Sequence, residues 1–256
     1  MKARPWMVAA LSLATLAAWT PVSSLPSKRY RVELKTSVVQ DLTALGQGEQ
    51  KQEFSNTGFV TLTTQDSAGG QAVTFVLDSL VLGEGSPIPP DAAKAAAGST
   101  WHGFRGTGGR VSELKLEKDD QVAGAIEPAL QLLLPPMKAG TKEGQAWTDT
   151  TEADNNGVSV RTVTNFQTST DSYNGTKVLR LAGAFSSAMS GQQASPQGTL
   201  SIEGSGSGTN AWLVGSDGTC FTASHQATQN ISLSLAQMPQ PIPVTVKTAG
   251  NTSLLK

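Results

Sequence analysis

Apolar residues recur at every second position along much of this chain, and this alternation constrains its possible folds more than any other feature. Between Tyr30 and Val39 the sequence reads YRVELKTSVV, which places four side chains on one face of an extended chain: Val32, Leu34, Thr36 and Val38. The same alternation, rich in β-branched residues and bounded by Gly, Asn and Ser, recurs at 57–64, 71–82, 109–117, 157–170, 177–185, 198–204, 220–235 and 241–248. The sequence therefore predicts a mainly β protein built from antiparallel hairpins.

Turns and two short helices complete the predicted elements. The pair Asn174-Gly175 predicts a two-residue hairpin turn, because both residue types tolerate a positive φ, and segments 66–71 and 215–219 predict further turns. Segment 89–98 begins with Pro and ends with Gly, as a short helix does. Segment 119–134 has Asp at its start and apolar residues at helical spacing, and Pro128 within it predicts a kink or a new first turn.

The two helical segments are too small to cover the predicted sheet. About ten strands, each ~30 Å long and ~4.8 Å from the next, make a face of ~1,400 Å². Helices of about 16 and 8 residues, each ~10 Å wide, cover about 350 Å². The sheet must therefore curl on itself, pack as two sheets, or leave a concave apolar surface free, and the last arrangement would be a binding site.

A break near the middle divides the chain into two halves that resemble each other. From Leu130 to Gly157 the sequence passes from an apolar cluster through two prolines and a Gly/Lys stretch to a Trp and a polar turn. Segments 99–116 and 209–226 each contain a Trp, a Gly-rich turn and a strand, which indicates a duplication, although chance also produces this pattern in β proteins. We expect an N-terminal β-rich half with the helices at 25–137 and a C-terminal β-rich half at 138–256. They would form two half-barrel-like repeats or one long curved antiparallel sheet.

Residues 1–24 have the form of a secretory signal peptide. Lys2 and Arg4 precede an apolar run, and small residues follow it at 22–24. The run is shorter than the ~20 residues needed to span a bilayer, so a retained anchor is the less favoured alternative. We expect a mature protein that is exported to the periplasm or the exterior of a bacterial cell and has no transmembrane span.

These features together resemble the LolA/LppX-type half-barrel proteins of the bacterial envelope. The segment LLLPPMKAGTKEGQAWTD (132–149) is also similar to an element of uncharacterised exported bacterial proteins. The resemblance implies a curved sheet that holds an acyl chain or the lipid of a lipoprotein, with helices plugging its mouth. It carries over no ligand residue, because that cavity is defined by apolar shape, and the lipobox of LppX-type members is absent here.

Residues that could support catalysis or bind a metal are few. His102 and His225 could meet across the structure, but a metal site needs a further ligand at a consistent spacing, and ordinary strand positions explain both residues. The single cysteine, Cys220, is predicted to be a core residue rather than a reactive one, and along a strand it would face the side opposite to His225. The run EGSGSGTN (203–210) matches neither a nucleophile elbow nor a phosphate loop and is predicted to be a flexible, solvated loop. We therefore predict no enzyme, catalytic residue, metal or cofactor.

The most favoured function is the binding of a lipid or another apolar ligand, or contact with envelope lipoproteins. Six large apolar residues are the candidates for lining a cavity, with ordinary core packing as the alternative: Phe75, Leu77, Trp101, Trp147, Phe166 and Trp212. The second hypothesis is a structural or protein-interaction module of the envelope with a closed core. A hydrolase is the third. The formal net charge is −1, and no basic stripe is present, which argues against nucleic acid as a partner.

Overall fold

The computed structural model describes residues 27–255 apart from 113, 139, 156, 196–197 and 236–239. The predicted signal peptide at 1–24 lies outside the described residues. Within them no helix is long and apolar enough to cross a membrane.

The described chain forms eleven strands, three short α-helices and one 3₁₀ turn. In chain order these are β1 (Ser27–Asp41), η1 (Thr43–Leu45), β2 (Glu49–Ser67), β3 (Gly70–Leu82), α1 (Pro90–Ala95), β4 (Thr100–Gly106), β5 (Lys115–Leu116), α2 (Gln121–Gly124), α3 (Glu127–Gln131), β6 (Ala146–Asn155), β7 (Val158–Tyr173), β8 (Thr176–Ser195), β9 (Gly198–Val214), β10 (Cys220–Leu235) and β11 (Ile242–Leu254). The prediction of a mainly β protein is confirmed.

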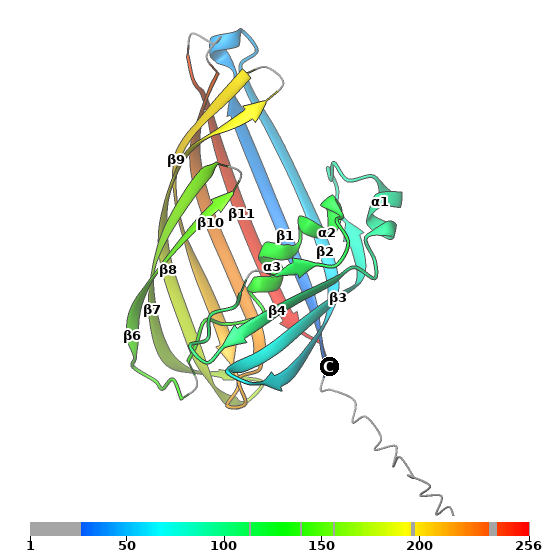
Figure 1. The fold of residues 1–256 in the computed structure, drawn as a ribbon, viewed down its shortest axis with the longest axis vertical. Helices are drawn as coiled ribbons and strands as arrows, with labels where there is room; N and C mark the ends of the chain where they lie inside the picture. The colour runs from blue at the N-terminus through cyan, green and yellow to red at the C-terminus, as the bar shows by residue number, and fades with distance from the viewer. Residues whose placement is uncertain are drawn as a thin grey trace, which may run out of the picture.

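All eleven strands belong to one antiparallel sheet in the order β5-β4-β3-β2-β1-β11-β10-β9-β8-β7-β6. Strands adjacent in the sheet are also adjacent in the chain, except where β1 pairs with β11, as in the pair Leu34 and Gly250. That pairing joins the two predicted halves into a single sheet. The sheet curves into an open trough that narrows toward one end (Figure 1), which confirms the expectation of a long curved sheet.

The turn predictions at the strand ends are confirmed. Asn174 and Gly175 link β7 to β8 with φ values of 49° and 77°, and Tyr173 pairs with Thr176 across the turn. The turns expected at 66–71 and 215–219 connect β2 to β3 and β9 to β10.

The helical prediction is correct in position, but the second segment is divided. Asp120 caps α2, since its Oδ1 accepts hydrogen bonds from the backbone N–H groups of Val122 (2.8 Å) and Ala123 (3.0 Å). Pro128 lies in the first turn of α3, where its missing N–H costs nothing. The described part of the chain therefore has three short α-helices in place of the two expected.

The Gly/Ser run at 203–210 is not a flexible loop, and that prediction was wrong. It forms the middle of β9 and pairs on both sides, with β8 and with β10. Its glycines lie on the crowded inner face: a Cβ on Gly208 would be 2.6 Å from Cζ of Phe185 and 2.2 Å from the carbonyl oxygen of Gln226. The intervening serines face solvent. The Gly/Ser composition suggested a flexible loop, but the alternation is a strand pattern. Glycine occupies the inward positions because the neighbouring strands leave no room there for a side chain.

Two strand boundaries also differ from expectation. The predicted strand at 109–117 is reduced to the two-residue β5 and a single bridge between Arg105 and Val111. Conversely, the polar stretch after Trp147 is extended rather than turned and forms β6 at the sheet's edge. A polar edge strand has one solvated margin, so its sequence lacks the apolar alternation of a central strand.

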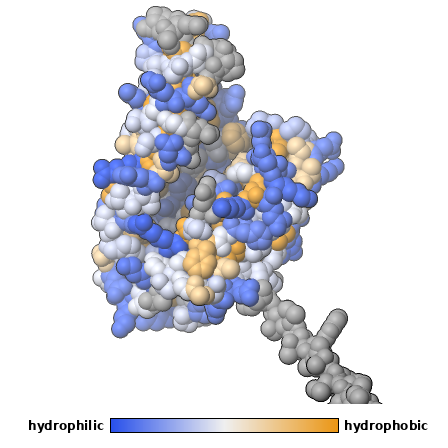
Figure 2. Space-filling model, in the orientation of Figure 1, coloured by the Kyte–Doolittle hydropathy of each residue, from blue (hydrophilic) through white to orange (hydrophobic). Residues whose placement is uncertain are grey.

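The core lies between the inner face of the sheet and the helical segment. The first cluster packs residues of β1 to β4 against α2 and α3 and includes Tyr30, Val60, Phe75, Trp101 and Leu130, all 0–1% exposed. α2 and α3 cross the trough at about mid-height in Figure 1, and Figure 2 shows that the same face is hollowed beside and above them. The expectation that the helices would leave part of the sheet uncovered is confirmed.

Candidate functional site

The wide lower end of the trough holds a pocket of about 980 Å³, which we call the rim pocket. Its walls are the β2–β3 turn, the end of β4, residues 137–138 and 140–143, the β7–β8 hairpin and the β9–β10 turn. Figure 1 shows these turns gathered at the lower end of the molecule. The volume lies at the upper end of the roughly 300–1,000 Å³ typical of small-molecule sites.

Arg105 is a charged residue of β4 that lines this pocket. Along β4 it follows Trp101 by four residues and Gly103 by two. Because alternate residues of a strand face the same side, Arg105 lies on the inward face with them. Its Nη2 donates hydrogen bonds to the carbonyl oxygens of Pro135 (2.8 Å) and Met137 (3.4 Å), which attach the segment after α3 to the sheet. Burial lowers the pKa of Arg105 from its ordinary value, but a guanidinium remains protonated in any aqueous pH range of interest.

The balance of charge in the rim pocket is positive. Besides Arg105, three lysines line it: Lys138, Lys142 and Lys177. Its two carboxylates are already engaged, because Asp217 accepts a hydrogen bond from the Thr219 hydroxyl (2.5 Å) and pairs with Lys28 (3.6 Å), and Glu143 accepts one from the Thr170 hydroxyl. Among the described residues, Arg105 forms no ion pair with a carboxylate.

The pocket also has an apolar wall. Met137, Val178, Leu179 and Val214 line it, and all but Met137 come from strands. A cavity that combines such a wall with a few convergent charged groups suits an amphipathic molecule.

Two ionisable groups behind this wall keep their protons. Burial raises the pKa of the Cys220 thiol to about 12, and the nearby Arg105 charge opposes this shift only in part. Burial also raises the pKa of the Tyr30 phenol, and the proximity of Cys220 and Asp217 acts in the same direction. Neither group is therefore prepared to act as a nucleophile or base near neutral pH. The burial of Cys220, which is 2% exposed, confirms it as a core residue.

The structure divides the six predicted cavity residues into two groups. Phe75, Leu77 and Trp101 are fully buried in the first core cluster beneath the helices. The other three, Trp147, Phe166 and Trp212, form a second cluster. In it the Trp147 and Phe166 rings stack with their centroids 5.1 Å apart, and the centroids of the Phe166 and Trp212 rings are 6.3 Å apart. Trp147 borders a hollow of about 390 Å³, which lies next to the rim pocket along Lys138 and Thr141. A lining role for these side chains stays a prediction.

Trp212 joins the second cluster to the helical segment. Its Nε1 donates a hydrogen bond of 2.8 Å to the carbonyl oxygen of Leu132, just after α3. Leu132 and Met137 pack on the same cluster. The segment between α3 and β6 is thus held from both sides of the trough, by Trp212 on β9 and by Arg105 on β4.

The two histidines do not meet. Nε2 of His102 lies 2.8 Å from Glu117 on the outer part of the sheet, whereas Nδ1 of His225 lies 2.7 Å from the Asn210 side chain on the inner face. Burial lowers the pKa of His225, and its ring stacks on Phe185 at 5.8 Å. Within the part of the chain that the structure describes, no three His, Cys, Asp or Glu side chains gather as a metal site.

The prediction that Cys220 and His225 face opposite sides of the sheet was wrong. Val214 pairs with Cys220 and Leu213 with Thr222, so Phe221 is an extra residue in β10. Such a bulge reverses the alternation on one side of it, which places Cys220 and His225 on the same face. The hydrogen bonds of His225 go to Asn210 and Thr248, and Cys220 donates instead to the Thr222 carbonyl.

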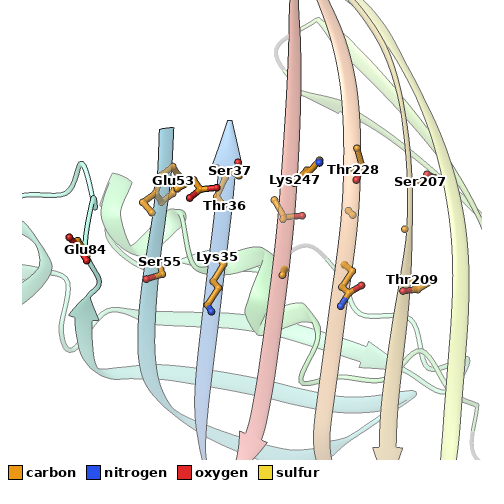
Figure 3. A pocket seen from close by; sticks show the side chains of 16 residues that line it. Lys35, Thr36, Ser37, Glu53, Ser55, Glu84, Ser207, Thr209, Thr228 and Lys247 are labelled. Atoms are coloured by element: carbon orange, nitrogen blue, oxygen red, sulfur yellow. The ribbon is translucent and has the colours of Figure 1, made fainter. Parts of the chain in front are cut away.

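A second hollow of about 720 Å³ lies on the opposite face of the sheet. It crosses β2, β1, β11, β10 and β9, and Figure 3 shows its polar side chains, among them Lys35, Lys247, Thr209 and Glu53. Glu53 is already paired with Lys51 at 2.7 Å, which lowers the pKa of the Glu53 carboxyl. Lys35, Lys247 and Thr209 are exposed. This hollow is a solvated sheet face, and the rim pocket is the better candidate for a ligand site.

Arg105 was not identified from the sequence, although a signal for it existed. In TWHGFRG the inward positions of the strand are Trp101, Gly103 and Arg105, so a charged residue falls on the apolar face. A charged residue on an inward face is uncommon, and it usually has a hydrogen-bonding or oppositely charged partner.

Comparisons with known proteins leave the chain without a family. No family model matches it, and no curated protein matches it. A search of solved structures finds DynF from the dynemicin biosynthesis pathway of Micromonospora chersina at 11% identity, over 99% of this chain and 94% of that one, with a TM-score of 0.24. A likeness of this size supports neither a shared fold nor a shared function.

Proposed function

We propose that this protein is an exported, non-enzymatic binding protein of the bacterial envelope, and that it holds a lipid or a similar apolar molecule in the rim pocket. The observation that carries the proposal is the rim pocket itself, about 980 Å³ in volume and walled by Met137, Leu179 and Val214. The curved sheet and the short helices over its inner face support the resemblance to half-barrel lipid carriers. The protonated state of Cys220 and Tyr30 favours binding over catalysis.

The direct test is native mass spectrometry of the mature protein purified without detergent from an exporting bacterial host. We expect a co-purifying mass that extracts into organic solvent, or an adduct after incubation with phospholipid and fatty acid. The variant Leu179→Trp should fill the pocket and lose the adduct. Leu45→Trp is the matched control, since Leu45 is 45% exposed in η1, outside the pocket lining. A bare protein mass under all these conditions would overturn the proposal.

A second function, that of a structural or protein-interaction module, is favoured by the packing of the aromatic residues. Phe75 and Trp101 are 0% exposed, and Phe166 and Trp212 are 6% and 4% exposed, as in a closed core. On this hypothesis, Leu179→Trp and Leu45→Trp behave alike in the lipid assay, and the native protein and both variants are purified without a lipid adduct.

A further inference from the structure

We infer that the ligand of the rim pocket is an amphiphile with an anionic head group, a carboxylate or a phosphate, which Arg105 binds. The inference rests on the proposed function and specifies the chemistry of the molecule at the same site. Its physical basis is a guanidinium that is partly withdrawn from water and has no carboxylate partner among the described residues.

The hydrogen-bonding capacity of Arg105 is only partly used. A guanidinium has five N–H donors on three nitrogens. The hydrogen bonds to Pro135 and Met137 both come from Nη2, while Nη1 and Nε have no partner within the described residues. The remaining N–H groups, on Nη1 and Nε, point away from different edges of the guanidinium plane, so an anionic oxygen would accept a charge-assisted hydrogen bond from one of them.

The surrounding charges favour an anion and disfavour a cation. Lys138 and Lys142 come from the segment between α3 and β6, and Lys177 comes from the start of β8, so positive charge reaches the pocket from two sides. Asp217 and Glu143, the two carboxylates of the lining, are held by Lys28, Thr219 and Thr170 rather than by Arg105. An anion bound at Arg105 would supply a counter-charge that none of the described carboxylates provides.

The apolar wall determines the rest of the ligand. Met137, Leu179 and Val214 give no hydrogen-bonding side chain to a polar molecule, and the pocket is much larger than an isolated phosphate or carboxylate requires. A hydrocarbon chain on this wall and an anion at Arg105 would satisfy both parts of the pocket at once.

The test compares ligands that share one chain and differ only at the head: oleate, methyl oleate, oleylamine and oleoyl lysophosphatidic acid, with inorganic phosphate as the head group alone. Binding is measured by titration calorimetry below the micellar concentrations. We expect oleate or the lysophosphatidic acid to bind about ten- to a hundredfold more tightly than methyl oleate, the range for charge-assisted hydrogen bonds. The stronger of the two anions identifies the head group.

Variants assign this preference to Arg105. Arg105→Gln should reduce the preference for the anion over methyl oleate to less than about threefold. Because Arg105 also holds Pro135 and Met137, the double variant Lys142→Gln/Lys177→Gln provides a second test at exposed residues that make no such contact. It should weaken oleate binding by several-fold and reduce its dependence on salt concentration.

The outcomes separate the two proposals. Equal affinity for oleate and methyl oleate would overturn the anionic head group and leave the carrier function standing. Binding of inorganic phosphate as tight as that of the lysophosphatidic acid would show a free-phosphate site and overturn the amphiphile. Binding of none of the five compounds would overturn both.

Discussion

Replacing Gly208 with alanine tests whether the Gly/Ser run packs as a strand with a crowded inner face. An added Cβ would lie 2.2 Å from the carbonyl oxygen of Gln226 and 2.6 and 2.7 Å from two ring carbons of Phe185, whereas ordinary contacts begin at 3.4 Å. The ring could turn, but the carbonyl belongs to the backbone of β10 and can move only with that strand. The new methyl group therefore forces a backbone displacement.

The expected size of the effect follows from two opposing terms. Overpacking of a close contact costs about 1–3 kcal/mol. Replacing glycine in a regular element returns about 0.5–1 kcal/mol of conformational entropy. We expect Gly208→Ala to lower the free energy of unfolding by about 1–2 kcal/mol, which shifts the urea midpoint by about 0.5–1 M at an m-value of about 2 kcal/mol/M.

The assay is urea unfolding followed by circular dichroism, with Ser207→Ala as the control. Ser207 is the preceding residue of β9 and is exposed on the other face, so its substitution should change stability by less than about 0.5 kcal/mol. If Gly208→Ala is as stable as the native protein, the inner face has room for a side chain, and the packing argument for the glycines is wrong. Equal losses in both variants would show that the effect comes from strand propensity rather than from crowding.

Three further predictions concern the second cluster and its neighbours. Trp212→Phe removes the hydrogen bond to Leu132 and should cost about 1–2 kcal/mol, with faster amide exchange around Leu132 but unchanged exchange in distant β2; protection equal to the native level would contradict the anchoring role. Burial lowers the pKa of His225, so the unfolded chain binds its proton more readily, and stability should fall as the pH drops below about 6.5. His225→Gln should flatten this part of the stability profile, and an unchanged slope would assign it to other groups. The buried Cys220 thiol, with a pKa of about 12, should react with Ellman's reagent only after unfolding; rapid reaction in the folded state would refute its burial.

The alternation of residues by itself determined the class of fold. Period two with β-branched residues gives strands wherever a face is buried, and the Asn174-Gly175 pair fixes a turn through its backbone preferences alone. The shortage of helix relative to sheet area also followed from sequence, because it depends only on residue counts and standard dimensions. These properties are local or additive, so they require no knowledge of which segments meet.

The tertiary structure decided what local pattern could not. Gly208 could be recognised as a packed strand residue only once Phe185 and Gln226 were known to lie against it, since a Gly/Ser run has the same composition in a linker and in a crowded strand. The bulge at Phe221, which reverses the faces of Cys220 and His225, arises from pairing with β9. The rim pocket depends on the same kind of information. It gathers Arg105, Lys142, Lys177 and Val214 from four separate parts of the chain. These residues lie close together because the pairing of β1 with β11 joins the two halves of the chain into one curved sheet.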